Sequence, residues 1–162
     1  MNRQTEERAL ARPMITNYLK YWRVIKFWVQ EKYKLTSGEL DMLLFLHDEE
    51  IFGHEKYNEF NELLSWNKGR LKKLIDEEWI EPWRQGNGKR GSKALYEVSY
   101  KTKRVVNSIY KKLSGEEIPE SLMNNPIFYK NVSFKSKVYK NFIIQMNKDL
   151  RKMRASKRNN QL

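Results

Sequence analysis

The stretch from Trp79 to Tyr100 interrupts the helical pattern of the surrounding chain, and this interruption constrains the fold more than any other feature. Residues 79–84 contain Pro82, which cannot continue a helix. Residues 85–93 hold three glycines and three basic residues, and residues 94–100 alternate strand-forming Tyr and Val with Glu and Ser. Two extended runs joined by a glycine-rich loop predict a β-hairpin with a basic tip.

Apolar residues spaced three and four positions apart predict amphipathic helices on both sides of this hairpin. The predicted helices are 15–33, 37–50, 54–64, 66–78, 101–113 and 133–155. Thr36 is a good N-cap, and Glu39 stands three residues later, where a capping box places its carboxylate. Gly115 is expected to end the fifth helix. The predicted fold class is therefore mainly α with a small β-hairpin.

The composition favours one folded domain and excludes several kinds of site. Hydrophobic residues make up 40% of the 162 residues, enough for a core. The chain has no cysteine, which excludes disulfides, thiol catalysis, iron–sulfur clusters and Cys-based zinc sites. No apolar run is long enough for a membrane span, and the N-terminus lacks an apolar signal-peptide centre. We expect a soluble, cytoplasmic protein with one domain at 14–155, flexible at 1–13 and in a basic tail at 156–162.

The net charge is strongly positive and unevenly distributed. Lys and Arg number 32 against 20 Asp and Glu, giving +12 and a sequence pI near 9.8. Residues 35–63 carry eight acids and one base, residues 84–104 carry seven bases and one acid, and residues 130–162 carry ten bases and one acid. One acidic segment followed by two basic ones indicates a face that meets a polyanion. The alternative is that the charges are ordinary solvated helix faces.

The fourth predicted helix presents a cationic face. Its buried stripe is Leu71, Leu74 and Ile75. At 100° per residue, Trp66, Gly69 and Lys73 lie opposite that stripe, with Arg70 and Lys72 beside them. A glycine inside a helix costs about 1 kcal/mol relative to alanine. Gly69 is explained equally well by close approach to a large partner and by relief of crowding between helices.

The order of these segments resembles that of a known family. LTSGELDMLLFLHDEE, then HEKYNEFNELLSWNKGRLKKLIDEEWI, then a basic hairpin ending in LYEVSYKTKR, is similar to the winged helix-turn-helix of MarR-type transcription regulators. The resemblance covers about residues 35–113. It implies a winged helix-turn-helix core at 35–113, flanked by dimerisation helices in 14–34 and 114–155, and a homodimer that binds double-stranded DNA.

Three departures from the family pattern are visible. Glu78 stands where the family favours glycine before an aromatic–Ile pair. The helix before it is about one residue short, and the acidic residue common in the family's wing is absent from residues 87–90. The resemblance carries no inducer site, so a small-molecule effector has no support in the sequence.

The resemblance and the charge pattern together assign candidate residues. The helix at 66–78 would enter the major groove, and the wing at 84–93 would contact the backbone or minor groove. The candidate DNA-binding residues are Asn67, Lys68, Arg70, Lys72, Lys73, Arg84, Lys89, Arg90 and Lys93. The candidate dimerisation residues are Leu19, Trp22, Ile25, Val29, Val138, Phe142, Met146 and Leu150. Asn67 ranks last because its angle lies near the buried stripe, and Trp66, Trp79 and Trp83 are expected to pack internally.

The sequence favours a binding protein over an enzyme and leaves its role open. It contains no catalytic motif, and it predicts no cofactor, metal or membrane contact. One hypothesis is a dimeric transcription regulator at the nucleoid. The other is a structural or accessory DNA-binding protein, such as a virion, packaging or nucleoid-associated component. A winged helix used only for protein–protein contact is a weaker third alternative.

Overall fold

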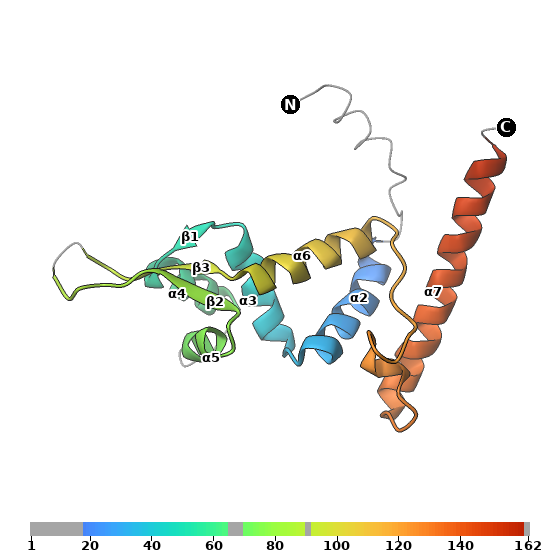
Figure 1. Ribbon diagram of the computed structural model, residues 1–162, viewed down its shortest axis with the longest axis horizontal. Coiled ribbons are helices and arrows are strands. Elements are labelled where there is room, and N and C mark those ends of the chain that lie inside the picture. The colour runs from blue at the N-terminus through green and yellow to red at the C-terminus, as the bar shows by residue number, and fades with distance from the viewer. Residues whose placement is uncertain (1–17, 65–69, 90–91, 161–162) are drawn as a thin grey trace. The chain divides into compact units, whose positions relative to one another are not determined.

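The computed structural model describes residues 18–64, 70–89 and 92–160, and within them the chain is mainly helical with a small antiparallel sheet (Figure 1). The elements fall into two units. The central unit is Lys34–Ser108, and the flanking unit comprises the residues up to Tyr33 and from Ile109 onward. The boundary lies inside one helix, α6 (Tyr100–Leu113). The central unit covers nearly the same residues as the predicted core at 35–113, whereas a single domain at 14–155 stays a prediction.

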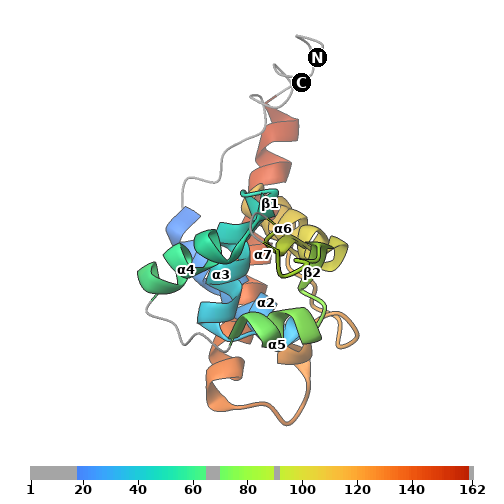
Figure 2. The same ribbon diagram turned by 90° about the vertical axis from the view of Figure 1, so that its left-hand side faces the viewer.

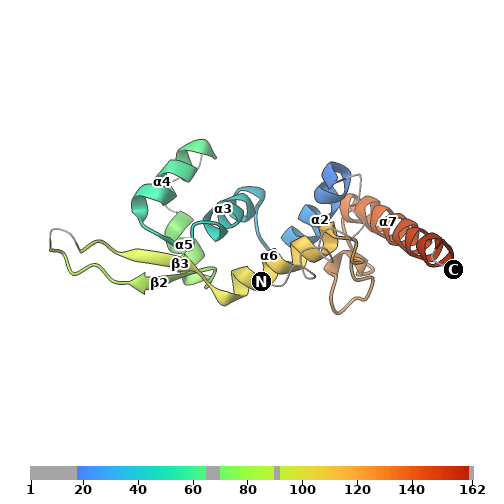
Figure 3. The ribbon, with the colours of Figure 1, turned by 90° about the horizontal axis from the view of Figure 1, so that it is seen from above.

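The central unit contains the predicted hairpin and one strand that the sequence did not reveal. Its elements before α6 are α3 (Ser37–His47), β1 (Ile51–Phe52), α4 (His54–Leu63), α5 (Arg70–Asp76), β2 (Ile80–Arg84) and β3 (Leu95–Val98). The strands pair antiparallel in the order β1-β3-β2, and Figure 3 shows β2 and β3 side by side. β1 has two residues, too few for an alternating pattern to show. This order is compatible with a winged-helix layout.

The predicted capping box is present at the start of α3. The Glu39 backbone N–H donates to Thr36 Oγ1 (3.3 Å), and the Thr36 N–H donates to Glu39 Oε2 (2.8 Å). The end of α3 differs from the prediction, because the helix stops at His47 rather than at Glu50. Three consecutive acids follow His47, and negative charge at a helix C-terminus opposes the helix dipole.

The helix α5 ends at Asp76, two residues before the predicted end at Glu78. The Glu78 N–H donates to the Ile75 carbonyl (3.0 Å) and the Trp79 N–H to the Leu74 carbonyl (2.8 Å), which is the pattern of a Schellman motif. Glu78 has φ +61°, the left-handed conformation that glycine normally occupies at this position. The left-handed residue at the end of α5 is therefore a glutamate.

The start of α6 is fastened to the residues that follow α5. The Ser99 N–H donates to the Trp79 carbonyl (3.0 Å), and Thr102 Oγ1 donates to the same oxygen (2.6 Å). Ser99 Oγ accepts from the Thr102 N–H (3.3 Å). These bonds tie the first turn of α6 to the residue that precedes β2. The Trp79 side chain is only 2% exposed, which confirms the expected internal packing.

The apolar residues buried in the central unit come from every helix and strand of the unit. Figure 2 shows α3 and α4 next to each other. The buried residues are Leu35, Leu40, Met42, Leu43, Leu46, Phe52, Tyr57, Phe60, Leu71, Leu74, Trp79, Ile80, Val98, Val105 and Val106. Leu63, the last residue of α4, is exposed.

The flanking unit consists of α2 (Tyr18–Tyr33), the end of α6, a short 3₁₀ turn η1 (Pro126–Phe128) and α7 (Phe134–Asn159). The helices α2 and α7 contact each other, and Phe27 stacks on Tyr139 with ring centroids 3.9 Å apart. α7 continues to Asn159, so residues 156–159 are not the flexible tail that was predicted. No proline or glycine interrupts them, and Lys157 and Arg158 in the last turn favour the helix dipole.

The predicted dimerisation stripe is divided between the interior and the surface of the chain. Ile25, Val29, Met146 and Leu150 are buried and therefore not accessible to a partner. Trp22 is half-buried, while Leu19 (87% exposed), Val138 and Phe142 are exposed. The periodicity identified amphipathic helices correctly, but it could not tell which apolar side chains α2 and α7 bury within the chain.

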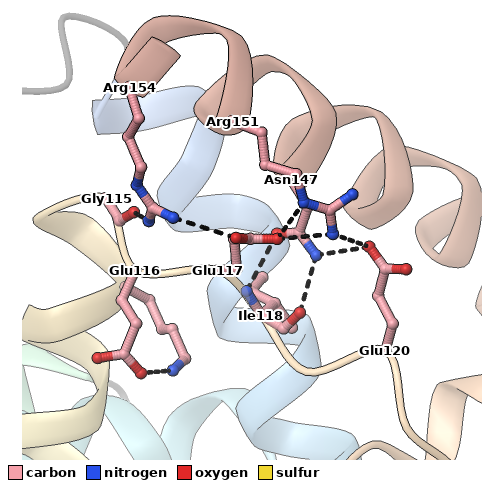
Figure 4. Close-up of polar contacts among 9 residues, drawn as sticks. Gly115, Glu116, Glu117, Ile118, Glu120, Asn147, Arg151 and Arg154 are labelled. Atoms are coloured by element: carbon pink, nitrogen blue, oxygen red, sulfur yellow. Dashed lines mark hydrogen bonds and ion pairs between the residues drawn. The ribbon is translucent and has the colours of Figure 1, made fainter. Parts of the chain in front are cut away.

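Polar contacts hold the segment after α6 against α7 (Figure 4). The amide of buried Asn147 accepts from the Ile118 N–H (3.1 Å) and donates to the Ile118 carbonyl (2.8 Å). Arg151 and Arg154 each pair with Glu117, at 2.7 and 3.1 Å. Arg151 and Arg154 are therefore used inside the flanking unit. Two further basic residues of 130–162 also contact this unit, Lys135 over the Phe27 ring and Lys140 over the Phe128 ring.

The left-handed Glu78 predicts a stability change. A non-glycine residue in this conformation destabilises the folded state by about 1–2 kcal/mol. Glycine avoids this cost, but its greater freedom in the unfolded chain offsets about 0.5–1 kcal/mol of the gain. We expect Glu78→Gly to raise the free energy of unfolding by about 0.5–1 kcal/mol in urea titrations. Glu78→Ala, the control for loss of the side chain, should change it little. Destabilisation by Glu78→Gly would contradict this account.

Candidate nucleic-acid interface

Three of the candidate cations lie on α5, and the structure separates their roles. Arg70 is the first residue of the helix and is half-buried, and Lys72 is exposed. Lys73 turns toward α3, where its Nζ lies 2.6 Å from Glu39 Oε1. It also lies 3.9 Å from Glu77, one turn further along α5. Lys73 therefore serves an internal ion pair, and the DNA-binding roles of Arg70 and Lys72 stay predictions.

Glu39 is the buried member of this ion pair. Its side chain is 2% exposed, against 48% for Lys73. Burial alone would raise the pKa of Glu39, but hydrogen bonds from Lys73 and the Thr36 backbone and the charge of Lys73 hold that pKa below its ordinary value. The same hydrogen bond and charge raise the pKa of Lys73. One carboxylate thus caps α3 and fixes a side chain of α5.

The loop between β2 and β3 is held by its own backbone and short side chains. Asn87 Oδ1 accepts from the Lys89 N–H (3.0 Å), and the Ser92 N–H donates to the Lys89 carbonyl (3.0 Å). Gly88 has φ +72°, and a Cβ at Gly86 would stand 3.0 Å from backbone atoms of Ser92 and Ala94. Gly86 therefore lies where the described arms of the hairpin approach each other closely, and Gly88 takes a left-handed conformation that glycine adopts without strain.

The described cations of this wing are all exposed, but two of them already bind other groups of the chain. Arg84 ends β2 and donates through Nη2 to the Lys93 carbonyl (3.3 Å). Lys89 is exposed in the loop. Lys93 pairs with Glu55 of α4 at 2.5 Å, and both side chains are largely exposed. An exposed pair of this kind is weak and easily exchanged for another anion.

Several candidates fall on residues outside the described part of the chain. They are Asn67, Lys68 and Arg90, together with Trp66 and Gly69 of the predicted helix start. Their roles stay predictions.

Two residues near the wing were not among the candidates. Lys101 lies over the Trp79 ring, with Nζ 3.8 Å from the centroid, and donates to the Glu77 carbonyl (3.0 Å). Trp83, expected to pack internally, is 51% exposed. The basic run at 84–104 already contained Lys101, but nothing in the sequence separates the buried Trp79 from the exposed Trp83.

A hollow of about 810 Å³ opens beside the wing, between β1, the start of α4 and the residues before β3. Phe52, Gly53 and Leu95 supply apolar surface. Among the charged residues that line it, Lys56 pairs with Glu59 (2.9 Å) and Lys93 with Glu55, and Glu49 adds a third acid. The hollow therefore has no excess of positive charge.

The described residues offer neither a metal site nor a membrane-spanning helix. Among them, no three His, Asp or Glu side chains gather closely enough to hold a metal ion. None of the described helices is long and apolar enough to cross a membrane.

Comparisons with known proteins give no relative. No family model matches the chain, and no curated protein or solved structure is significantly similar to it.

The Glu39–Lys73 pair predicts a dependence of stability on pH. Because the pKa of Glu39 is lowered in the folded state, its contribution is complete above about pH 5 and is lost as the pH falls through its folded pKa. Glu39→Gln keeps the capping bonds but removes the charge. We expect it to lose about 1–2 kcal/mol at pH 7, a value reduced for the partial exposure of Lys73.

The measurement is urea unfolding of both proteins between pH 7 and pH 3, where the difference should shrink. Glu55→Gln removes the exposed pair with Lys93 and is the matched control, for which little change is expected. A Glu39→Gln protein as stable as the parent at pH 7 would show that the buried pair does not hold α5.

Proposed function

We propose that this chain is a non-catalytic protein that binds double-stranded DNA through a winged helix-turn-helix, as a dimeric MarR-like transcription regulator. The observation that carries the proposal is the order α3-β1-α4-α5-β2-β3 with strands paired β1-β3-β2 and a basic hairpin between the last two. Winged-helix proteins place a helix in the major groove and a wing beside it. The positive charge of the chain suits a polyanionic partner.

In this proposal α4 braces α5, and α5 enters the major groove. Arg70 and Lys72 contact base edges or the adjoining phosphates, since side chains on a packed helix are held rigidly enough to read bases. Lys73 is a positioning residue, because its ammonium is bound by Glu39. Arg84, Lys89 and Arg90 of the wing neutralise phosphates, and Lys93 joins them by exchanging Glu55 for a phosphate oxygen.

A second candidate function is supported by the surface of α7. Residues 151–160 are all exposed, and they include Lys152, Lys157 and Arg158. Cations on an exposed helix raise affinity for any DNA sequence. A structural or accessory DNA-binding protein that coats or packages DNA would use this surface together with the wing.

If α5 contacts bases and the wing contacts phosphates, substitutions in the two elements should weaken DNA binding in different ways. Arg70→Ala should weaken binding to a preferred duplex by about 1–3 kcal/mol and to random DNA little. The double change Lys89→Ala and Arg90→Ala should weaken both and reduce the slope of log K against log salt by about 2. Lys111→Ala, an exposed lysine on α6, is the control for loss of one charge.

Binding is measured by fluorescence anisotropy at several salt concentrations, on a duplex selected from fragments that the protein retains at about 150 mM salt. A shared inverted repeat among the retained fragments favours the regulator, and retention without a shared sequence favours the accessory protein. Absence of retained DNA would overturn both.

The exposed apolar residues of α7 support a second copy of the chain as partner. Phe134, Val138 and Phe142 recur every four residues and are exposed, as is Leu19 on α2. An unpaired apolar stripe on each of two identical chains suits an isologous interface. Two copies would also offer two recognition helices to a two-fold symmetric DNA site.

The stripe predicts that a charge in it separates the dimer. Val138→Glu together with Phe142→Glu should convert a dimer of 19.7 kDa chains into a monomer in sedimentation at micromolar concentration. Lys137→Glu and Asn141→Asp, exposed positions outside the stripe, should leave the dimer intact. A parent chain that sediments as a monomer would refute the dimer.

A further inference from the structure

Trp83 is the most exposed of the described tryptophans. Its side chain is 51% exposed, whereas Trp28 and Trp79 are 1% and 2% exposed and Trp22 is half-buried. A tryptophan offers more apolar surface than any other side chain, so leaving half of it in water forgoes a large gain from burial. Packing in the core therefore does not explain why a tryptophan stands at position 83.

The backbone of β2 sets Trp83 apart from its neighbours. Pro82 pairs with Tyr96 and Arg84 pairs with Leu95, so the register shifts at Trp83 and leaves it without a partner on β3. An extra residue of this kind is a β-bulge, which redirects a side chain and is common beside binding sites. Trp83 is thus presented by the sheet itself rather than by the loop tip.

The residues that follow Trp83 are basic. Residues 84–93 contain four Lys or Arg and no acid. Arg84, the next residue, uses one guanidinium nitrogen for the Lys93 carbonyl, out of five N–H donors. The nearest acids on the strands are Glu81, two residues before Trp83, and Glu97, which stands opposite Glu81 on β3. An aromatic side chain at the edge of a cationic loop matches the surfaces that bind nucleic acid.

We propose that Trp83 contacts the nucleic acid directly, its indole packing on a base or sugar where the wing meets the duplex, with Arg84 and Lys89 on the flanking phosphates. This inference rests on the proposed function and adds a residue and a mode of recognition to it. An indole face reads no donor–acceptor pattern, so the contact is tolerant of sequence. It favours sites where a base unstacks easily, such as an unpaired base or a flexible step.

A protein partner is the competing explanation for an exposed tryptophan, because tryptophan is frequent among binding hot spots. The four cations in the sequence 84–93 and the net charge of +12 favour a polyanion over an ordinary protein surface.

The test uses the full chain and two labelled duplexes of the same sequence, one fully paired and one with a single unpaired base at its centre. We expect Trp83→Ala to raise Kd about 10- to 100-fold on the duplex with the unpaired base, and less on the paired duplex. Tyr110→Ala, an exposed aromatic on α6, is the control and should bind as the parent does.

Intrinsic fluorescence supplies a second readout that a structural role would not move. DNA should quench the tryptophan emission of the parent chain, and Trp83→Phe, folded by circular dichroism, should lose most of that quenching. If the parent binds DNA but both variants behave like it, Trp83 does not touch DNA and belongs to a protein interface, while the proposed function stands. If the parent binds neither duplex, the proposed function fails and this inference fails with it.

Discussion

The carboxylate of Glu39 connects the two helices on which the central unit depends. It accepts from the Thr36 backbone at the start of α3, and it binds Lys73 on α5 at 2.6 Å. A buried carboxylate is costly unless hydrogen bonds and a positive charge satisfy it, and here both are supplied. The orientation of α5 is thus fixed by a polar contact in addition to Leu71 and Leu74. A helix that reads a groove needs such support, because small rotations move its side chains off their targets.

The cations of the chain divide into those that hold the protein together and those that face outward. Lys73 and Lys101 bind groups of the central unit, and Arg151 and Arg154 bind Glu117 in the flanking unit. Lys72, Lys89 and the end of α7 lie on the surface. Net charge alone therefore overstates the charge that a nucleic acid would meet, and the distribution of exposed cations decides which surface binds.

Local chemistry made much of the fold predictable. Pro82 and the glycines at 86–91 predicted the hairpin, Thr36 and Glu39 the cap of α3, and Gly115 the end of α6. Contacts between distant residues were not predictable: Lys73 meets a carboxylate 34 positions earlier, and the two-residue β1 pairs only because β3 is beside it. The outward position of Trp83 depends on a register shift that no residue type specifies. The DNA contacts and the dimer stay predictions, because they depend on partners outside the chain.

The most direct test of the account is hydrogen exchange of the full chain with and without a saturating duplex. The account predicts slower exchange of the backbone amides in residues 70–76 and 80–95, where α5 and the wing would be covered by DNA. It predicts little change in the exchange of α4. Protection confined to α7, with α5 and the wing unchanged, would contradict it and would move the DNA-binding surface to the C-terminal helix.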